Sequence, residues 1–231
     1  MKTLKDYEYF RTENGVLYCG DNMEVLPLIK EPIDLCLTDP PYGINIEKMA
    51  YANNENKKAS KNSKAKSTAY DGGFKDDKID IKPLLKYPKQ IIWGGNYYSD
   101  VLPFSKSWLI WDKRTDDKYS NDFADGEIAY SNLKCGVRIF RFLWSGMIQG
   151  DMKNKEERFH PTQKPIPLLI WCIEKSDTEG IILDPFLGSG TTALACEKLN
   201  RRWIGIEISE KYCEIAKKRI EQYTNQLKLF K

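Results

Sequence analysis

The chain has 231 residues, of which 41% are hydrophobic and 30% are charged. This length supports one substantial hydrophobic core and excludes two full-sized domains, so we expect a single domain over residues 1–231. Apolar runs such as 166–173 are far shorter than the ~20 residues of a membrane-spanning helix, and residues 1–10 lack the apolar stretch of a secretory signal. We therefore expect a cytoplasmic protein that binds no membrane, with six reduced cysteines and no metal site.

The net charge of +3 is small, but the charges are unevenly distributed. Residues 48–66 contain six lysines and one acid, and the polar residues between them cannot build a core. The sequence thus predicts a flexible basic loop inserted at 44–79. Such a loop is either only a solvated segment or a means of gathering a phosphate backbone, for which Lys57, Lys58 and Lys61 are candidates.

The hydrophobic pattern alternates between strand-like and helix-like segments. In chain order we expect a strand at 15–19, a helix at 23–29, a strand at 33–38, a helix at 81–87, strands at 90–93, 108–111, 127–130 and 137–144, a helix at 167–175, a strand at 181–183, a helix at 191–199, a strand at 203–208 and a helix beginning at Ser209. The alternating patterns of 127–130 and 137–144 favour antiparallel strands at the far end of a sheet. Together these elements predict an α/β fold, a mostly parallel twisted sheet with helices on both faces.

A glycine-rich turn follows the predicted strand 181–183. Its sequence D-P-F-L-G-S-G-T-T-A begins at Asp184, and Gly188, Gly190 and Ala193 have the G-x-G-x-x-A spacing that lets a helix start close to a strand while the backbone approaches a ligand. Glu207 ends the next strand, where a carboxylate is suited to bind both hydroxyls of a ribose. The alternative is an ordinary tight turn with a surface glutamate.

The position of this turn in the chain is unusual. Only one predicted strand and one helix follow it, so the rest of the sheet must come from the N-terminal part of the chain. Standard dinucleotide folds carry the glycine turn after their first strand. The order of elements is therefore permuted, which argues against a standard NAD enzyme.

A second motif, T-D-P-P-Y-G at 38–43, ends the apolar run 33–37. Two prolines remove backbone donors and force the chain out of the sheet. In isolation this is a rigid strand-ending turn. Asp39, the carbonyl of Pro40 and the ring of Tyr42 also form a receptor for a planar molecule with an amino group, because two acceptors can hold its N–H groups while the ring stacks on its face.

With these residues the sequence resembles the β-class of S-adenosyl-L-methionine-dependent DNA amino-methyltransferases, the adenine-N6 and cytosine-N4 family. D-P-P-Y at 39–42 matches its catalytic motif, H-P-T-Q-K-P at 160–165 the segment before the cofactor loop, and D-P-F-L-G-S-G-T-T at 184–192 that loop. All three occur in the β-class order. The resemblance implies a Rossmann-like methyltransferase fold with a circularly permuted motif order, S-adenosyl-L-methionine as cofactor and DNA as partner.

The resemblance also implies catalytic roles. Asp39 and the carbonyl of Pro40 would accept hydrogen bonds from the target amino group, and Tyr42 would stack on a base flipped out of the duplex. Direct displacement then needs no covalent enzyme intermediate. An aspartate at the first motif position favours adenine N6. The alternatives are cytosine N4, an RNA substrate, and an inactive relative that only binds nucleic acid.

For the cofactor, the family motifs match residues in four segments of the chain. The residues implied to bind it are Asp184, Phe186, Gly188, Gly190, Glu207, His160, Thr162, Lys164 and Asp21. Among them, Thr162 and Lys164 would reach the cofactor carboxylate, and Asp21 would lie on the adenine side.

One departure from the family is the shortness of its target-recognition region, for which 132–159 is the only candidate. Its candidate nucleic-acid-binding residues are Arg138, Arg141, Lys153 and Arg158. Basic and aromatic residues suit contacts to phosphates and bases, but the alternating stretch 137–143 is equally compatible with a structural edge strand. Recognition would then be short, or shared with the lysine-rich loop or a second subunit in a possible homodimer.

Overall fold

The computed structural model describes residues 2–44, 77–114, 124–145, 148–150, 152–153, 155–157, 159 and 163–228. Residues 1–40 and 81–231 form the main compact unit, and residues 41–80 form a second one. Every described helix and strand belongs to the main unit. The predicted basic loop at 44–79 lies almost wholly outside the described residues and stays a prediction.

Within the described residues, nine strands form one sheet. Their order across it is β1 (Glu8–Arg11), β2 (Gly15–Cys19), β11 (Trp203–Glu207), β10 (Ile181–Asp184), β3 (Ile33–Thr38), β4 (Lys89–Trp93), β6 (Gly126–Ser131), β5 (Ser107–Asp112) and β7 (Val137–Arg141). Strands β2, β11, β10, β3 and β4 run parallel to one another, as predicted, so their carboxyl ends meet at one edge. A separate pair joins β8 (Trp144–Ser145) to β9 (Ile148–Gln149).

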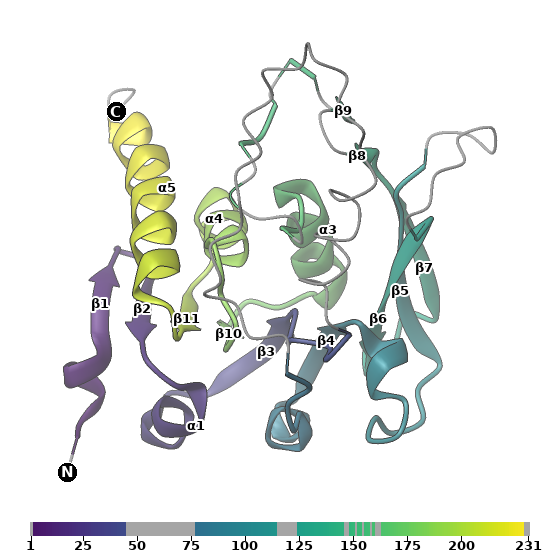
Figure 1. Ribbon diagram of the computed structural model, residues 1–231, viewed down its shortest axis with the longest axis horizontal. Coiled ribbons are helices and arrows are strands. Elements are labelled where there is room, and N and C mark those ends of the chain that lie inside the picture. The colour runs from purple at the N-terminus through teal and green to yellow at the C-terminus, as the bar shows by residue number, and fades with distance from the viewer. Residues whose placement is uncertain are drawn as a thin grey trace, which may run out of the picture. The chain divides into compact units, whose positions relative to one another are not determined.

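Helices lie on both faces of the sheet, which confirms the predicted layering. Figure 1 shows α3 (Ile166–Ser176), α4 (Thr191–Lys198) and α5 (Glu210–Lys228) on one face, and α1 (Asn22–Val25) on the other. The described residues also form short 3-10 segments at Leu4–Tyr7, Leu26–Leu28, Lys82–Lys86 and Gly95–Tyr98. In the part of the chain that the structure describes, no helix combines the length and apolar character needed to cross a membrane.

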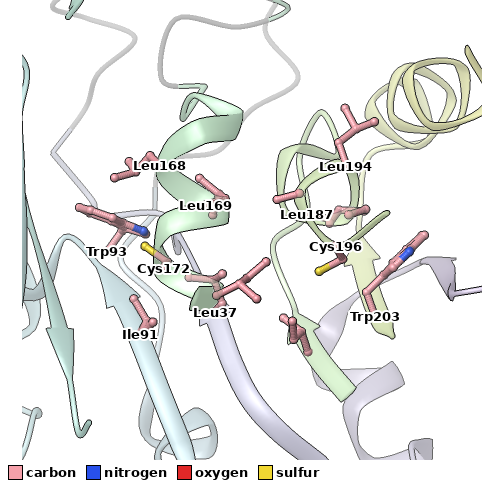
Figure 2. Close-up of a cluster of buried hydrophobic side chains, with 14 of the residues drawn as sticks. Leu37, Ile91, Trp93, Leu168, Leu169, Cys172, Leu187, Leu194, Cys196 and Trp203 are labelled. Atoms are coloured by element: carbon pink, nitrogen blue, oxygen red, sulfur yellow. The ribbon is translucent and has the colours of Figure 1, made fainter. Parts of the chain in front are cut away.

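The core fills the layer between the sheet and α3, α4 and α5. Figure 2 shows side chains of α3, among them Leu168 and Cys172, facing Leu37 of β3 and Trp93 of β4. These residues are almost fully shielded from solvent, and burying a large apolar side chain contributes about 1.5–3 kcal/mol. This packing fixes the carboxyl ends of β3 and β4 against the start of α3, which matters for the site.

Three sequence-based expectations need correction. Residues 82–86 form a short 3-10 segment rather than an α-helix, and it ends there because Pro88 disfavours helical backbone at Tyr87, which is extended. The strand expected at 137–144 ends at Arg141, and β7 pairs parallel with β5, because β6 and β7 flank β5 on opposite sides. Finally, the unpredicted β1 pairs with β2 and forms the other edge of the sheet.

Candidate functional site

The two motifs that are farthest apart in the sequence lie side by side in the fold. Strands β3 and β10 are neighbours, with Leu183 opposite Cys36. One residue before Asp39, the hydroxyl of Thr38 donates a hydrogen bond of 2.7 Å to Oδ1 of Asp184. The D-P-P-Y motif and the glycine-rich loop therefore begin at the same edge of the sheet, as the sequence predicted.

Asp184 holds the glycine-rich loop in shape. Its Oδ1 also accepts a hydrogen bond from the backbone N–H of Phe186 (3.1 Å), and its Oδ2 accepts one from the hydroxyl of Thr192 (2.6 Å). The side chain is almost fully buried, and its hydrogen bonds connect the neighbouring strand β3, the loop itself and the start of α4. A direct contact of Asp184 or Phe186 with the cofactor stays a prediction.

The buried Asp184 carboxylate makes stability depend on pH. Burial raises its pKa from 3.8 to about 6, although three hydrogen bonds oppose the shift. The folded state therefore binds the proton more tightly, and we expect the free energy of unfolding to fall by about 2 kcal/mol as pH rises from 4 to 7. Asp184→Asn should lack this decline. Urea denaturation of both proteins across this range measures the difference, and identical slopes would contradict the assignment.

Glu207 lies at the end of β11 and braces the same loop. Its Oε2 accepts a hydrogen bond from the N–H of Gly188 and its Oε1 one from the N–H of Ser209, both at 2.8 Å. Burial raises the pKa of this carboxyl, and these backbone donors counteract the shift. A carboxylate has about four acceptor sites, so the two bound N–H groups leave capacity for two further donors.

Asp21 lies near Glu207 because β2 and β11 are neighbours. Cys19 at the end of β2 is opposite Glu207, and Asp21 follows two residues later. Its Oδ1 accepts a hydrogen bond of 2.8 Å from the N–H of Met23, which caps the start of α1. The side chain is exposed, and its predicted contact with the cofactor is untested.

Gly190 is required by the geometry of the loop. Its φ is +86°, and a Cβ atom there would lie 2.9 Å from Cβ of Ala216 in α5. We expect Gly190→Ala to lower the free energy of unfolding by about 3 kcal/mol, because backbone strain adds to overpacking. Gly136 has φ +66°, and a Cβ atom there would make only an ordinary contact of 3.6 Å with Nη1 of Arg138, so it is the matched control and should lose only the strain, about 1–2 kcal/mol. Equal losses in urea denaturation would contradict the packing argument.

The segment before α3 lies between the two motifs. Oε1 of Gln163 accepts hydrogen bonds from the N–H of Phe159 (3.0 Å) and the hydroxyl of Ser189 (3.2 Å). The next residue, Lys164, points to the other motif, and its Nζ donates a hydrogen bond of 2.5 Å to Oδ2 of Asp39. The third family motif thus contacts both others.

Two charged residues at the site were missed by the sequence analysis. Arg219 of α5 donates hydrogen bonds to the carbonyl (2.5 Å) and hydroxyl (3.0 Å) of Ser189, and its guanidinium lies 5.0 Å from the centre of the Phe159 ring. Burial lowers its pKa to about 10. Glu127 of β6 forms an ion pair with Lys164 at 2.9 Å. Neither belongs to a motif, so only their three-dimensional neighbours identify them.

The predicted catalytic residues belong to different compact units of the structure. Asp39 is partly buried and Pro40 is buried, both in the main unit. Tyr42 is partly buried and belongs to the second unit, so its stacking role stays a prediction. Several predicted site residues lie outside the described residues: His160, Thr162, Lys57, Lys58, Lys61 and Arg158.

The described basic residues of the predicted target-recognition segment are exposed. Arg138 donates a hydrogen bond of 2.9 Å to the carbonyl of Val137, Arg141 forms an ion pair of 3.3 Å with Asp112, and Lys153 lies beyond the sheet. Strand β7, which carries both arginines, is the edge of the sheet. The edge-strand interpretation of 137–143 therefore holds for β7, and contacts of these residues with nucleic acid are untested.

The aromatic side chains of β7 and of the residues after it pack inward. The rings of Phe140 and Trp171 of α3 are 5.3 Å apart, and Phe142 lies 6.0 Å from Phe140 and 6.3 Å from the buried Trp144. Their contribution to packing against α3 explains why aromatic residues alternate with arginines here.

The site residues suit S-adenosyl-L-methionine. The remaining acceptor sites of Glu207 match the two ribose hydroxyls, and the adjacent side chain of Ile208, 69% exposed, offers apolar surface for a purine. The glycine-rich loop, with positive φ at Gly188 and Gly190, presents backbone without side chains. These features define a nucleotide-type site at the carboxyl edge of a Rossmann-like sheet.

Comparisons with known proteins agree with this geometry. Residues 105–218 match the model of the N6_N4_Mtase family, described as DNA methylase. The Type II methyltransferase M2.LlaDCHI of Lactococcus lactis subsp. cremoris is 27% identical over 93% of this chain and 92% of its own. Among solved structures, the M1.HpyAVI–SAM complex matches with a TM-score of 0.51 and 23% identity, covering 88% of this chain and 98% of that chain. The cytosine-N4-specific PvuII DNA methyltransferase matches with a TM-score of 0.56 and 17% identity, over 91% and 87%.

These matches confirm that the fold is that of a Rossmann-like methyltransferase. The family model covers just under half of the chain, and together with the Type II methyltransferase relatives it supports an S-adenosyl-L-methionine-dependent DNA amino-methyltransferase of the N6/N4 family.

Proposed function

We propose that this protein methylates the exocyclic N6 of adenine in DNA, after the target base has flipped out of the duplex, by direct displacement. The observation that carries the proposal is the position of Asp39, one residue after Thr38, whose hydroxyl bonds to Asp184 at the start of the glycine-rich loop. An acceptor for an amino group and a nucleotide-binding loop are thereby neighbours at one sheet edge. When bound, S-adenosyl-L-methionine supplies an electrophilic methyl group at this edge.

The chemistry of the target explains the need for acceptors. The lone pair of an exocyclic amino nitrogen is delocalised into the ring, so the nitrogen is a poor nucleophile. Acceptors at Asp39 and the carbonyl of Pro40 favour the pyramidal form that can attack, and the negative charge of Asp39 offsets the positive charge that develops on nitrogen. This role requires no nucleophilic side chain from the protein.

The choice of adenine rests on the motif rather than on the geometry. In the resemblance described above, aspartate at the first motif position accompanies adenine, and here that residue is Asp39. Cytosine N4 is the second candidate, because both bases present an amino group to the same acceptors. The likeness to the cytosine-N4-specific PvuII enzyme, at 17% identity, concerns the fold and favours neither base.

The remaining sequence-based expectations belong to this proposal. Exposed Arg138, Arg141 and Lys153 are suited to phosphate contacts. A homodimer would extend a short target-recognition segment, and we retain it and a cytoplasmic location as proposals. The Type II methyltransferase name of M2.LlaDCHI supports a place in a restriction–modification system.

Identification of the methylated nucleoside tests the proposal. The protein is incubated with duplex DNA, single-stranded DNA or RNA and isotopically labelled cofactor, and the nucleic acid is digested and analysed by mass spectrometry. We expect label in N6-methyladenine from DNA. Label in N4-methylcytosine would select the second candidate, label only in RNA would refute DNA as substrate, and DNA binding without transfer would indicate an inactive relative.

A further inference from the structure

Four charged side chains from four segments form a continuous network of ion pairs beside the glycine-rich loop, which we call the charge network. Nζ of Lys164 lies 2.5 Å from Oδ2 of Asp39 and 2.9 Å from Oε2 of Glu127, and Oε1 of Glu127 forms an ion pair with Lys113. Asp39 follows β3, Lys164 precedes α3, Glu127 lies near the start of β6 and Lys113 follows β5. Cations and anions alternate, so the four charges balance.

The centre of the charge network is shielded from solvent. The side chain of Lys164 is 6% exposed, and its ammonium lies 5.6 Å from the centre of the buried Trp93 ring. Oε2 of Glu127 is inaccessible to solvent. Removing one partner of a buried ion pair leaves an uncompensated charge, so the members of the charge network depend strongly on one another.

The side chains of the charge network keep one another ionised. Burial alone would lower the pKa of Lys164, but the carboxylates of Asp39 and Glu127 outweigh burial and raise it. Burial alone would raise the pKa of Glu127, but Lys164 and Lys113 lower it to about 2. Lys164 therefore stays protonated and Glu127 ionised at neutral pH.

We propose that Glu127 is a positioning residue for methyl transfer, which holds Lys164 so that Lys164 orients the carboxylate of Asp39 and compensates its negative charge. This inference rests on the proposed role of Asp39 as acceptor for the target amino group. Glu127 touches neither substrate nor cofactor in this role. It acts through Lys164, whose two carboxylate partners place its ammonium between β3 and β6.

The arrangement has a chemical purpose. A carboxylate that accepts an amino group must be ionised and correctly oriented before the base arrives, because reorganisation during the reaction adds to the barrier. Lys164 donates a hydrogen bond to Oδ2 of Asp39, which fixes this oxygen and places a cation beside the carboxylate. Glu127 prevents Lys164 from swinging away. The alternative is an ion cluster that only stabilises the fold.

A double-mutant cycle separates the two interpretations. We expect Glu127→Gln to slow methyl transfer in single turnover by about 10-fold, Lys164→Met by about 100-fold, and the double variant by no more than Lys164→Met within about twofold. Calorimetry should find the affinity for S-adenosyl-L-methionine unchanged in Glu127→Gln. Losses that multiply in the double variant, or a wild-type rate in Glu127→Gln, would overturn the inference.

The pH profile gives a readout that a structural role would not move. Among the described residues, Lys164→Met leaves Asp39 beside the carboxylates of Glu127 and Asp184, so the pKa of Asp39 should rise. Cys172 of α3, which also lies near Lys164, is uncharged because burial raises the pKa of its thiol. Transfer by Lys164→Met should therefore fall as pH drops from 8 to 6, whereas the wild-type rate stays flat. Parallel profiles would count against the inference.

Glu197→Gln is the matched control. Glu197 is another buried carboxylate, which accepts hydrogen bonds from Thr12, Asn14 and Trp203 and does not belong to the charge network. Its loss should lower thermal stability but leave the transfer rate per folded molecule unchanged, and an equal loss of rate in both variants would refute a specific role for Glu127. Wild-type protein that transfers no methyl group refutes the proposed function itself. Full activity in Asp39→Ala would remove the role of Asp39 and this inference with it.

Discussion

Replacing Asp39 with alanine is expected to slow methyl transfer by about 1,000-fold, while the affinity for S-adenosyl-L-methionine changes by less than about threefold. The variant loses the charged acceptor that makes the amino nitrogen nucleophilic, a contact that strengthens as positive charge develops on nitrogen. The cofactor loop keeps its supports, because Asp184 and Glu207 retain their hydrogen bonds to the loop. The loss should therefore appear in the rate of chemistry and not in cofactor binding.

Single-turnover kinetics with labelled cofactor measure this effect, and calorimetry measures the cofactor affinity. Asp34→Ala is the matched control, because Asp34 lies on the same strand β3 but near its opposite end, where it pairs with Lys89. Lys164 keeps Glu127 as a partner in Asp39→Ala, so the variant should fold. Wild-type transfer by Asp39→Ala would end the catalytic assignment, and an equal loss in Asp34→Ala would make the effect one of folding.

The part of the fold that the sequence predicts best is the part built from buried parallel strands. The residues of β3, β10 and β11 are nearly all apolar, because both faces of these strands are covered, and each strand ends at a turn with a clear chemical signature. Their adjacency followed from the permuted motif order and is confirmed by the pairing of β10 with β3 and β11. Motif order thus predicted the sheet edge that carries the site.

The far end of the sheet was less predictable for a physical reason. Alternation between exposed and buried residues reveals a strand but not the direction in which it pairs. Strand β7 has an alternating sequence, yet it runs parallel to β5, because a short connection at 132–136 carries the chain from one side of β5 to the other. The local hydrophobic pattern therefore does not determine whether a strand pairs parallel or antiparallel.

The site shows the same limit at the level of single side chains. Lys164 was expected to reach the cofactor carboxylate, because it lies in a motif next to the cofactor loop. In the fold its ammonium lies between Asp39 and Glu127, which are 125 and 37 positions away in the sequence. Cofactor contact by Lys164 stays a prediction, but its two ion pairs bind it to the catalytic motif. Glu127 has no motif at all, and only the register of β6 against β4 brings it to the site.

Replacing Glu207 with alanine is expected to weaken the binding of S-adenosyl-L-methionine by about 100-fold, or about 2.7 kcal/mol. The variant would lose hydrogen bonds from ribose hydroxyls to a charged acceptor, each of which contributes about 1.5–3 kcal/mol. It would also release the N–H of Gly188 and loosen the loop. Glu210→Ala is the matched control, since it removes an exposed charge three residues later without touching this loop. An unchanged dissociation constant in Glu207→Ala would remove Glu207 from the site.

A cofactor analogue separates the direct contact from the effect on the loop. S-adenosylhomocysteine lacking the ribose 2′-hydroxyl should bind the wild-type protein about 10-fold more weakly than S-adenosylhomocysteine, because one donor to Glu207 is missing. In Glu207→Ala the two ligands should bind equally, since no carboxylate remains to distinguish them. A persistent preference for the complete ribose in the variant would show that another group holds the hydroxyl, and Glu207 would then act only by bracing Gly188. The difference between the two ligands is thus the quantity that assigns the ribose to this carboxylate.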